Sequence, residues 1–146
     1  MNPTDAALHD LLAASRTIAV VGHSDKPYRD SYGVAQYLRQ SGYTVYAVNP
    51  NLRTVAGETA YPDLRQLPER IDIVDVFRRS EHLPGIVDEA IAVGAKTIWG
   101  QLEVEDEASR RKALDAGLNV AMNLCLRTEH ERFMQHPMKG EVNKLG

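Results

Sequence analysis

Cysteine is nearly absent from this chain: Cys125 is the single cysteine among 146 residues. One cysteine excludes an internal disulfide and a zinc site built from cysteines. The five histidines are scattered, without a helical pair or an acidic cluster at ligand spacing. The sequence therefore predicts no metal site.

Long apolar runs and a leader-like N-terminus are also missing. No segment approaches membrane-spanning length. Residues 1–5 lack the basic stretch and apolar core that mark a signal peptide. We therefore expect a cytoplasmic protein that does not enter a membrane.

Neither sign of charge dominates. The 17 Lys and Arg against 20 Asp and Glu give a formal net charge of −3, which argues against a general nucleic-acid binder. A small polyanionic ligand needs only a local cluster of cations and stays possible. With 43% apolar residues, the chain is long enough to bury a core. We expect one domain over residues 1–146, with its core at about 15–134 and a frayed tail at 135–146.

The most informative segment is 17–24, where an apolar, β-branched run ends on Gly22 and polar residues follow. A helix is expected over 31–38, with Ser31 as its N-cap, and a second strand over 44–48. This order of strand, helix and strand is typical of a mononucleotide-binding half.

Strand-like and helix-like segments continue to alternate along the chain. Asp63 is suited to cap a short helical turn that ends near Leu67. Further strands are expected at 71–77, 96–99 and 119–122, and further helices at 4–14, 83–93, 105–116 and 126–134. The pattern predicts an α/β fold: a Rossmann-type, doubly wound parallel sheet of about five strands with helices on both faces.

Ligands of such sheets bind at the carboxyl ends of the strands. After the first strand, Gly22 is followed by His23 and Ser24, so the G-x-G-x-x-G fingerprint of dinucleotide sites is incomplete. The Ser24 hydroxyl and the charges of Lys26 and Arg29 suit a pyrophosphate. The alternative is a plain turn with solvated cations. His23 is an acid or base candidate, but no catalytic partner is evident beside it.

The turn after the second strand carries Asn49, Pro50 and, further on, Arg53. An NAD site usually has an acidic residue here for the ribose hydroxyls. An arginine suits an extra phosphate on the nucleotide better. The alternative is that Asn49 and Pro50 only form a turn.

After the third strand come Phe77, Arg78 and Arg79. An aromatic ring beside guanidiniums could stack on a purine and reach phosphate oxygens. In the alternative interpretation Phe77 belongs to the core, and the arginines pair with Glu81 and Asp75.

The fourth strand ends at Trp99, which we expect in the core, followed by Gly100 and Gln101. Gly100 permits close approach of a backbone, and Gln101 has an amide that could hydrogen-bond a ligand.

Taken in order, these motifs resemble a known family over residues 17–133: the small stand-alone bacterial CoA-binding proteins, related to the CoA-binding domain of the succinyl-CoA synthetase alpha subunit. The motifs that carry the resemblance lie at 18–24, 27–32, 37–38, 42–45, 48–50, 57, 71–78, 99–101 and 125–130. The resemblance implies a doubly wound fold that binds coenzyme A, with the nucleotide across the ends of the first and third strands.

By the same resemblance, Gly22 and Ser24 approach the pyrophosphate, one of Lys26, Arg29 or Arg53 meets phosphate charge, and Phe77 and Arg78 lie on the adenine side. The complete set of expected CoA-binding residues is Gly22, His23, Ser24, Lys26, Arg29, Ser31, Asn49, Pro50, Arg53, Phe77, Arg78, Gly100 and Gln101.

The chain departs from the family pattern at two places. Glu103 stands where the family usually has glycine, and Asn123-Leu124 stands where Asp-Arg usually precedes the cysteine. The second change removes an acid and a base near the edge of the crevice.

Cys125, Glu129 and His130 invite comparison with a nucleophile and its base. At five residues apart on a helix, Cys125 and His130 point to different sides, so we assign the cysteine to packing. We therefore expect a module that binds a small molecule, CoA or an acyl-CoA, without catalytic machinery. Two alternatives stay open: an NADP-dependent reductase or redox sensor, and an interaction subunit with a vestigial nucleotide crevice.

Overall fold

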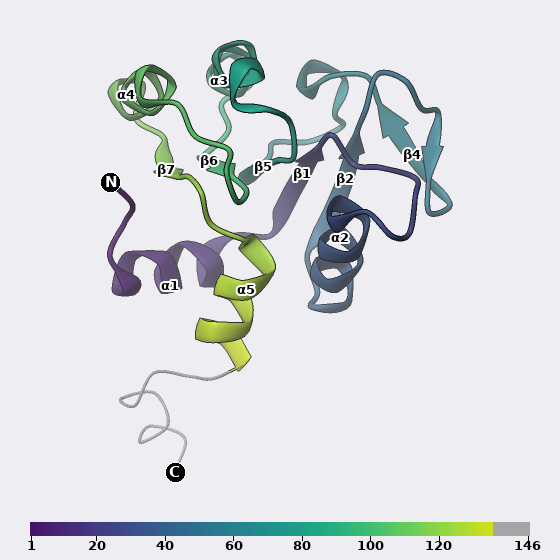
Figure 1. Ribbon diagram of the computed structural model, residues 1–146, viewed down its shortest axis with the longest axis horizontal. Coiled ribbons are helices and arrows are strands. Elements are labelled where there is room, and N and C mark those ends of the chain that lie inside the picture. Colours follow the sequence, from purple (N-terminus) through teal and green to yellow (C-terminus); the bar gives the residue numbers. More distant parts are fainter. Residues whose placement is uncertain (136–146) are drawn as a thin grey trace.

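A computed structural model describes residues 1–135 of the chain. Apart from residue 135, the predicted frayed tail lies outside the described residues. Parallel strands form the centre of one twisted sheet in the order β3-β4-β2-β1-β5-β6-β7 (Figure 1). The strands are β1 (Thr17–Val21), β2 (Thr44–Val48), β3 (Thr54–Val55), β4 (Glu58–Tyr61), β5 (Ile73–Val76), β6 (Thr97–Gly100) and β7 (Asn119–Ala121).

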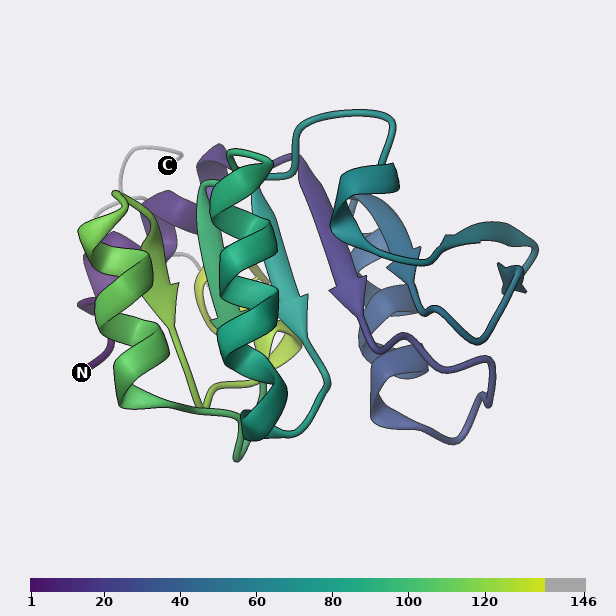
Figure 2. The same ribbon diagram turned by 90° about the horizontal axis from the view of Figure 1, so that it is seen from above.

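The α/β prediction is confirmed, and the five predicted strands are all present. Helices cover both faces, as Figure 2 shows from above. One face carries α1 (Asp5–Ala14), α2 (Asp30–Gln40) and α5 (Leu126–His130), and the other carries α3 (Leu83–Ala92) and α4 (Glu107–Asp115). Each face buries its own apolar cluster, so the sheet is hydrophobic on both sides, as expected for parallel strands.

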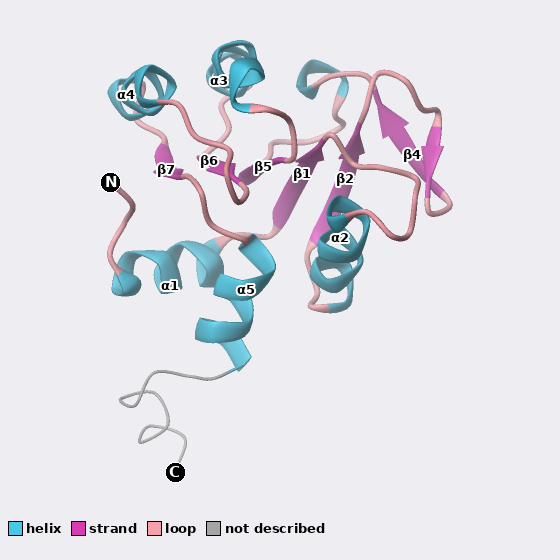
Figure 3. Ribbon diagram, viewed as in Figure 1, coloured by secondary structure: helices cyan, strands magenta, loops and turns pink. Residues whose placement is uncertain are grey.

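The sequence predicted about five strands, and the structure has seven in residues 1–135. The two additional strands, β3 and β4, form a hairpin after Pro50, where a loop was expected (Figure 3). β4 pairs with β2 in parallel through two residues only, and β3 pairs with β4 in antiparallel fashion. Strands of two and four residues at a sheet edge are too short to show an alternating pattern, which is why the sequence did not reveal them.

The ends of several helices differ from the prediction. α2 begins at Asp30, so Ser31 lies inside the helix and is not its N-cap. Beyond α5, the chain continues in a π-helical turn, Glu131–Gln135, in place of a regular helix. Asp63 caps a short 3₁₀ helix, Leu64–Gln66, as predicted, and a second one spans Ser80–His82.

The order of the strands fixes where a ligand can bind. β1 lies between β2 and β5, and the chain leaves it first towards β2 and later towards β5. This is the switch point of a doubly wound sheet, and its crevice opens beyond the carboxyl ends of β1 and β5.

Candidate ligand site

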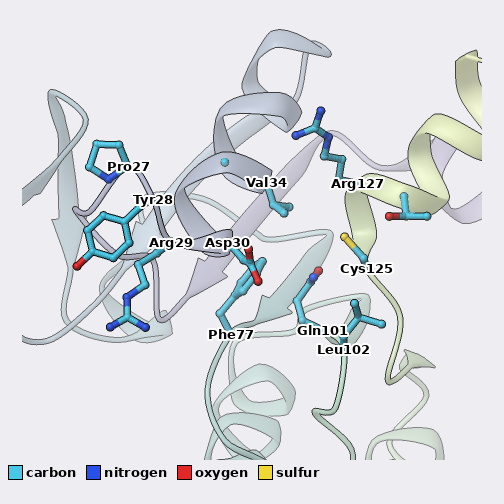
Figure 4. Close-up of a pocket in the computed structure, with 12 residues that line it drawn as sticks. Pro27, Tyr28, Arg29, Asp30, Val34, Phe77, Gln101, Leu102, Cys125 and Arg127 are labelled. Atoms are coloured by element: carbon cyan, nitrogen blue, oxygen red, sulfur yellow. The ribbon is translucent and has the colours of Figure 1, made fainter.

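Three neighbouring cavities lie at the carboxyl ends of the strands. The glycine cavity has a volume of about 390 Å³ and is lined by Gly22, Ser24, Arg29, Asp30, Ser31 and Phe77. The cysteine cavity measures about 450 Å³ (Figure 4). Its lining consists of Pro27, Tyr28, Arg29, Asp30, Gly33, Val34, Phe77, Gln101, Leu102, Cys125, Arg127 and Thr128. The two cavities share Arg29, Asp30 and Phe77, so they form one continuous groove.

The third cavity, called the Arg78 cavity, lies on the other side of Gly22 and measures about 200 Å³. It is lined by Val21, Val48, Pro50, Pro62, Asp63, Leu64, Arg78, Ile86 and Glu89. The side chain of Arg78 lies against Gly22, with its Cδ 3.0 Å from where a Cβ on that glycine would be. Gly22 thus lies between the Arg78 cavity and the glycine cavity.

Position 22 requires glycine because of its backbone conformation and because neighbouring atoms leave no room for a side chain. Its φ is +88°, and a Cβ would lie 2.8 Å from the Phe77 carbonyl oxygen. Its N–H donates to the Val48 carbonyl at 2.8 Å. The ends of β1, β2 and β5 therefore meet at a residue that has no room for a side chain.

The loop after Gly22 is held by two serines. The Ser24 N–H donates to Ser31 Oγ at 3.0 Å, and the Lys26 N–H donates to Ser24 Oγ at 3.0 Å. Both hydroxyls keep a proton that a ligand oxygen can accept. Ser31 acts as a loop anchor at the start of α2, a role that replaces the predicted N-cap.

The charge around the glycine cavity is mixed. The N-terminal end of α2 contributes Asp30 and Ser31 to the lining, and such a helix end favours an anion. Asp30 opposes an anion there, whereas Arg29 attracts one. Lys26 is exposed and lines none of the three cavities.

His23 is a packing residue and not an exposed acid or base. Its side chain is fully buried. Its Nδ1 donates to the Ser24 carbonyl at 2.9 Å, and its Nε2 accepts from Arg39 Nη1 at 3.3 Å. Burial lowers the pKa of His23, which keeps the imidazole neutral. The His23 side chain lines none of the three cavities.

Asn49 and Arg53 do not line these cavities either. The Asn49 side chain donates to the His23 carbonyl at 3.0 Å and accepts from the Asn51 N–H at 2.9 Å. It forms a turn, as the alternative interpretation held, and also ties two loops together. Arg53 lies at the start of the hairpin, where its carbonyl accepts from the Ala60 N–H. Pro50 lines the Arg78 cavity.

Phe77 and Arg78 both lie at the site, on opposite sides of Gly22. Phe77 is half-buried and separates the glycine cavity from the sheet core. Arg79 is exposed and pairs with Glu81 at 4.0 Å, as the alternative interpretation expected. The expected pairing of these arginines with Asp75 is wrong, because Asp75 is fully buried inside the sheet.

At the end of β6, Gly100 and Gln101 contact later segments of the chain itself. A Cβ on Gly100 would lie 2.3 Å from the Val104 carbonyl, so the close backbone approach is made by the chain itself. Gln101 Oε1 accepts from the Leu126 N–H at 3.0 Å, while its amide nitrogen keeps two protons for a ligand. Trp99 is fully buried, as predicted, and donates to the Leu124 carbonyl at 2.9 Å.

No hydrogen bond joins Cys125 to His130 in the part of the chain that the structure describes. His130 is buried and bonds through Nδ1 to the Tyr37 hydroxyl at 2.7 Å, joining α5 to α2. Glu129 pairs with Arg132 at 3.1 Å. Cys125 packs on the apolar cluster, as predicted, but it is also partly exposed and lines the cysteine cavity.

The sequence did not lead us to expect that the segment after β7 forms one wall of the cysteine cavity. Cys125 was assigned to packing alone, and Arg127 was not considered. The loops that follow all parallel strands gather at one edge of the sheet, so the segment after β7 belonged with the others. Tyr28 and Leu102, both exposed at the cavity mouth, carry no pattern that marks them as site residues.

The fold and the grouped cavities define a Rossmann-type domain with a crevice at its switch point. Among residues 1–135 no group of His, Cys, Asp and Glu is placed to hold a metal ion. In the same residues no helix is long and apolar enough to cross a membrane.

The chain belongs to the CoA-binding domain family, whose model matches residues 16–131. It is 37% identical over 129 residues to the uncharacterized protein YneT of Bacillus subtilis (strain 168), covering 88% of this chain and 96% of that protein. A solved structure of a hypothetical protein from Pyrococcus horikoshii OT3 superposes with a TM-score of 0.88 at 38% identity, over 90% of this chain and 93% of that one.

The chain is also similar to part of a larger enzyme. Over 89 residues it is 29% identical to the ADP-forming acetate–CoA ligase I of Archaeoglobus fulgidus. The match covers 61% of this chain but only 13% of the ligase. The resemblance to CoA-binding proteins seen in the sequence is thereby confirmed.

Proposed function

We propose that this protein binds coenzyme A or an acyl-CoA across the three cavities and acts in the cytoplasm as a binding, carrier or sensing module. The arrangement of the cavities supports the proposal. The glycine and cysteine cavities are continuous, and the Arg78 cavity lies next to them across Gly22, so an extended ligand with a nucleotide at one end and a flexible arm at the other would span all three.

Each part of CoA has a place in this arrangement. The adenosine lies on the Arg78 side, where apolar residues and a guanidinium are combined with the carboxylates of Asp63 and Glu89. The pyrophosphate lies at the glycine cavity, against the start of α2 and within reach of Arg29. The pantetheine arm follows the cysteine cavity past Phe77 towards Gln101, whose free amide N–H groups suit the carbonyls of the arm.

The family supports the ligand class, since its model is described as a CoA binding domain. One relative is named as an ADP-forming acetate–CoA ligase. Nothing of that enzyme's reaction is transferred to this chain, which spans a small part of its length. Binding alone is proposed, with no turnover.

Calorimetric titration with CoA tests the proposal directly. We expect saturable binding at one site and weaker binding by Arg29→Gln. Arg79→Gln is the matched control, because it removes the same charge from an exposed arginine outside the cavities. Equal binding by both variants, or none by the parent protein, would contradict the proposed site.

Two further measurements separate the two alternatives from CoA binding. A change in nicotinamide fluorescence with NADPH, together with no response to CoA, would favour the reductase or redox sensor. Arg53, which favoured that alternative, lies outside the three cavities. An interaction subunit with a vestigial crevice would show no rise in melting temperature with CoA, whereas a ligand of the folded state stabilises it.

A further inference from the structure

The face of α2 that lines the cysteine cavity begins with an aspartate. Asp30, Gly33 and Val34 are the residues of α2 in the lining, and their spacing of three and four residues places them on one side of the helix. Asp30 is the first residue of α2 and is exposed. The wall that α2 contributes is therefore a carboxylate followed by a glycine and a valine.

Asp30 also lies where two cavities join. Together with Arg29 and Phe77 it lines both the glycine cavity and the cysteine cavity. Figure 4 shows Arg29 on one side of Asp30 and Gln101 on the other. A ligand that extends from one cavity into the other therefore passes a cation, an anion and an aromatic ring at the same point.

The Asp30 carboxylate is available to such a ligand. Among residues 1–135 it forms no ion pair and no hydrogen bond. The neighbouring guanidinium of Arg29 lies over the ring of Tyr28, at 5.7 Å from its centre. An acidic residue in the first turn also stabilises the helix itself, and this structural role is the alternative that an experiment has to separate.

A carboxylate at this junction has opposite effects on two kinds of ligand. It repels phosphate oxygens, so it weakens the binding of a nucleotide that ends at the pyrophosphate. It strengthens the binding of a ligand that continues into the cysteine cavity with a hydroxyl or amide N–H, because a hydrogen bond to an ionised acceptor is stronger than one between neutral groups. The arm of CoA has such donors, since it begins with a hydroxyl group and continues with two amide N–H groups.

The cavity stays open along α2 beyond the aspartate. No atom lies within 4 Å of the Cβ that Gly33 would gain. Gly33 lies one helical turn after Asp30 in the same wall, so the absence of a side chain there leaves space for a chain that has passed Asp30.

We propose that this face of α2 recognises the pantetheine arm of CoA: the Asp30 carboxylate accepts a hydrogen bond from the first donors of the arm, and the arm continues past Gly33. This inference rests on the proposed function, because the nucleotide must bind first and direct the arm along α2. The face selects ligands that carry the arm over nucleotides that end at the pyrophosphate.

Calorimetry with two ligands tests the inference. One is CoA, and the other is adenosine 3′-phosphate 5′-diphosphate, which is CoA without its arm. The ratio of their dissociation constants measures what the arm adds to binding. We expect Asp30→Asn to reduce the advantage of CoA by about fivefold or more, because a hydrogen bond to a charged group is lost. A role in helix stability alone affects both ligands equally and leaves the ratio unchanged.

Asp25→Asn is the matched control for the charge. It removes the same charge from an exposed residue of the same loop that lines none of the three cavities, so the ratio should stay as in the parent protein. An unchanged ratio in Asp30→Asn, or an equal fall in Asp25→Asn, overturns recognition by Asp30.

A second variant tests the path of the arm. Gly33→Leu places a side chain in the cavity one turn beyond Asp30, so it should weaken the binding of CoA and leave that of the arm-free nucleotide unchanged. Gly85→Leu is its control, since Gly85 lies in α3 outside the three cavities and has no atom within 4 Å of the Cβ it would gain. Equal effects of Gly33→Leu on both ligands overturn the path along α2.

The parent protein separates the two levels of the proposal. Normal CoA binding by the parent, with no change of the ratio in the variants, overturns recognition by α2 and leaves the binding function intact. Absence of CoA binding by the parent overturns the proposed function itself.

Discussion

The side-chain oxygen of Asn123 accepts a 2.7 Å hydrogen bond from the backbone N–H of Glu103. Both residues have left-handed backbone, with φ of +69° at Glu103 and +60° at Asn123. They also belong to the two places, Glu103 and Asn123-Leu124, at which the sequence was expected from its resemblance to depart from the family's usual pattern. The departures therefore meet in one contact between the loops after β6 and β7, where one residue stands in place of glycine and the other keeps an acceptor oxygen.

Replacing Glu103 with glycine should stabilise the protein. An L-residue in the left-handed region costs about 1–2 kcal/mol, part of which is offset by the entropy of glycine in the unfolded chain. We expect a gain of about 0.5–1 kcal/mol in the free energy of unfolding, measured by urea denaturation. Glu105→Gly is the control, since Glu105 is exposed and is not among the residues with positive φ, and it should destabilise. The same sign for both variants would contradict the explanation.

At Asn123, the acceptor oxygen should matter more than the amide. Asn123→Ala removes the oxygen and places alanine at a positive φ, so we expect a loss of about 1–2 kcal/mol. Asn123→Asp keeps the oxygen and should stay within about 0.5 kcal/mol of the parent. Thermal denaturation of the two variants side by side gives the comparison. Equal losses would show that the hydrogen bond contributes little.

The phosphate that CoA has and dephospho-CoA lacks should strengthen the binding of CoA. A charge-assisted contact to a phosphate contributes about 1.5–3 kcal/mol, so dephospho-CoA should bind about 10- to 150-fold more weakly. Of the candidate cations, Arg29 and Arg78 line the cavities, and Arg78 lies on the adenosine side. Arg78→Gln should abolish most of the difference between the two ligands in calorimetry. If Arg78→Gln weakens both ligands equally, the phosphate lies elsewhere.

Gly22 should be intolerant of any side chain, for reasons of folding as well as binding. Gly22→Ala must adopt a φ of +88° and places its Cβ 2.8 Å from the Phe77 carbonyl. We expect a loss of about 1–3 kcal/mol in stability, together with weaker CoA binding. Gly85→Ala is the control: Gly85 lies in α3 outside the three cavities, no atom lies within 4 Å of the Cβ it would gain, and a helical glycine replaced by alanine gains about 0.5–1 kcal/mol.

The buried carboxyl of Asp75 should make the protein less stable as the pH rises. Burial raises its pKa in the folded state, so above about pH 4 the folded protein binds a proton that the unfolded chain has lost. Stability then falls with rising pH, by at most about 1.4 kcal/mol per pH unit, until the folded-state pKa is passed. Asp75→Asn removes this titration. Relative to the parent, the variant should therefore become more stable as the pH rises from 4.5 to 8.

Asp72 provides the control with the opposite sign. Although burial opposes it, hydrogen bonds from the backbone N–H groups of Arg16 and Thr17 lower the pKa of Asp72. The ionised Asp72 carboxylate therefore adds to the free energy of unfolding at neutral pH. This stabilisation is lost as the pH falls through the lowered pKa of Asp72 in the folded state. Asp72→Asn should therefore destabilise at pH 8 more than at pH 3.5. Urea denaturation at several pH values measures both trends, and a pH-independent difference for Asp75→Asn would contradict the assignment.

Long periodic segments made most of the fold predictable. The run that became β1 is buried throughout, and the helix after it and β2 each bury the apolar residues of their pattern. The hairpin of β3 and β4 was not predictable, because its pairing depends on the edge that β2 offers and not on its own short sequence. The same limit applied to the end of α5, where the chain forms a π-helical turn that its apolar pattern does not distinguish from a regular helix.

For the site, glycine and charge patterns located the correct edge of the sheet but did not show which way each side chain points. His23 and Ser24 are neighbours in one loop, yet one is fully buried and the other lines the glycine cavity. Gly100 was correctly associated with a close approach, but the approaching group is Val104 of the same chain. Such distinctions depend on distant residues such as Arg39, which no local pattern reveals.

The hydrogen bond between the Tyr37 hydroxyl and His130 Nδ1 has a further consequence for the width of the cysteine cavity. It joins α2 to α5, and Arg127 lies over the Tyr37 ring at 4.8 Å, so the two helices are fastened beside the cavity that they enclose. Widening that space would break both contacts. Under the proposed function, the fixed spacing between α2 and α5 limits the width of the arm or acyl group that can enter the cysteine cavity.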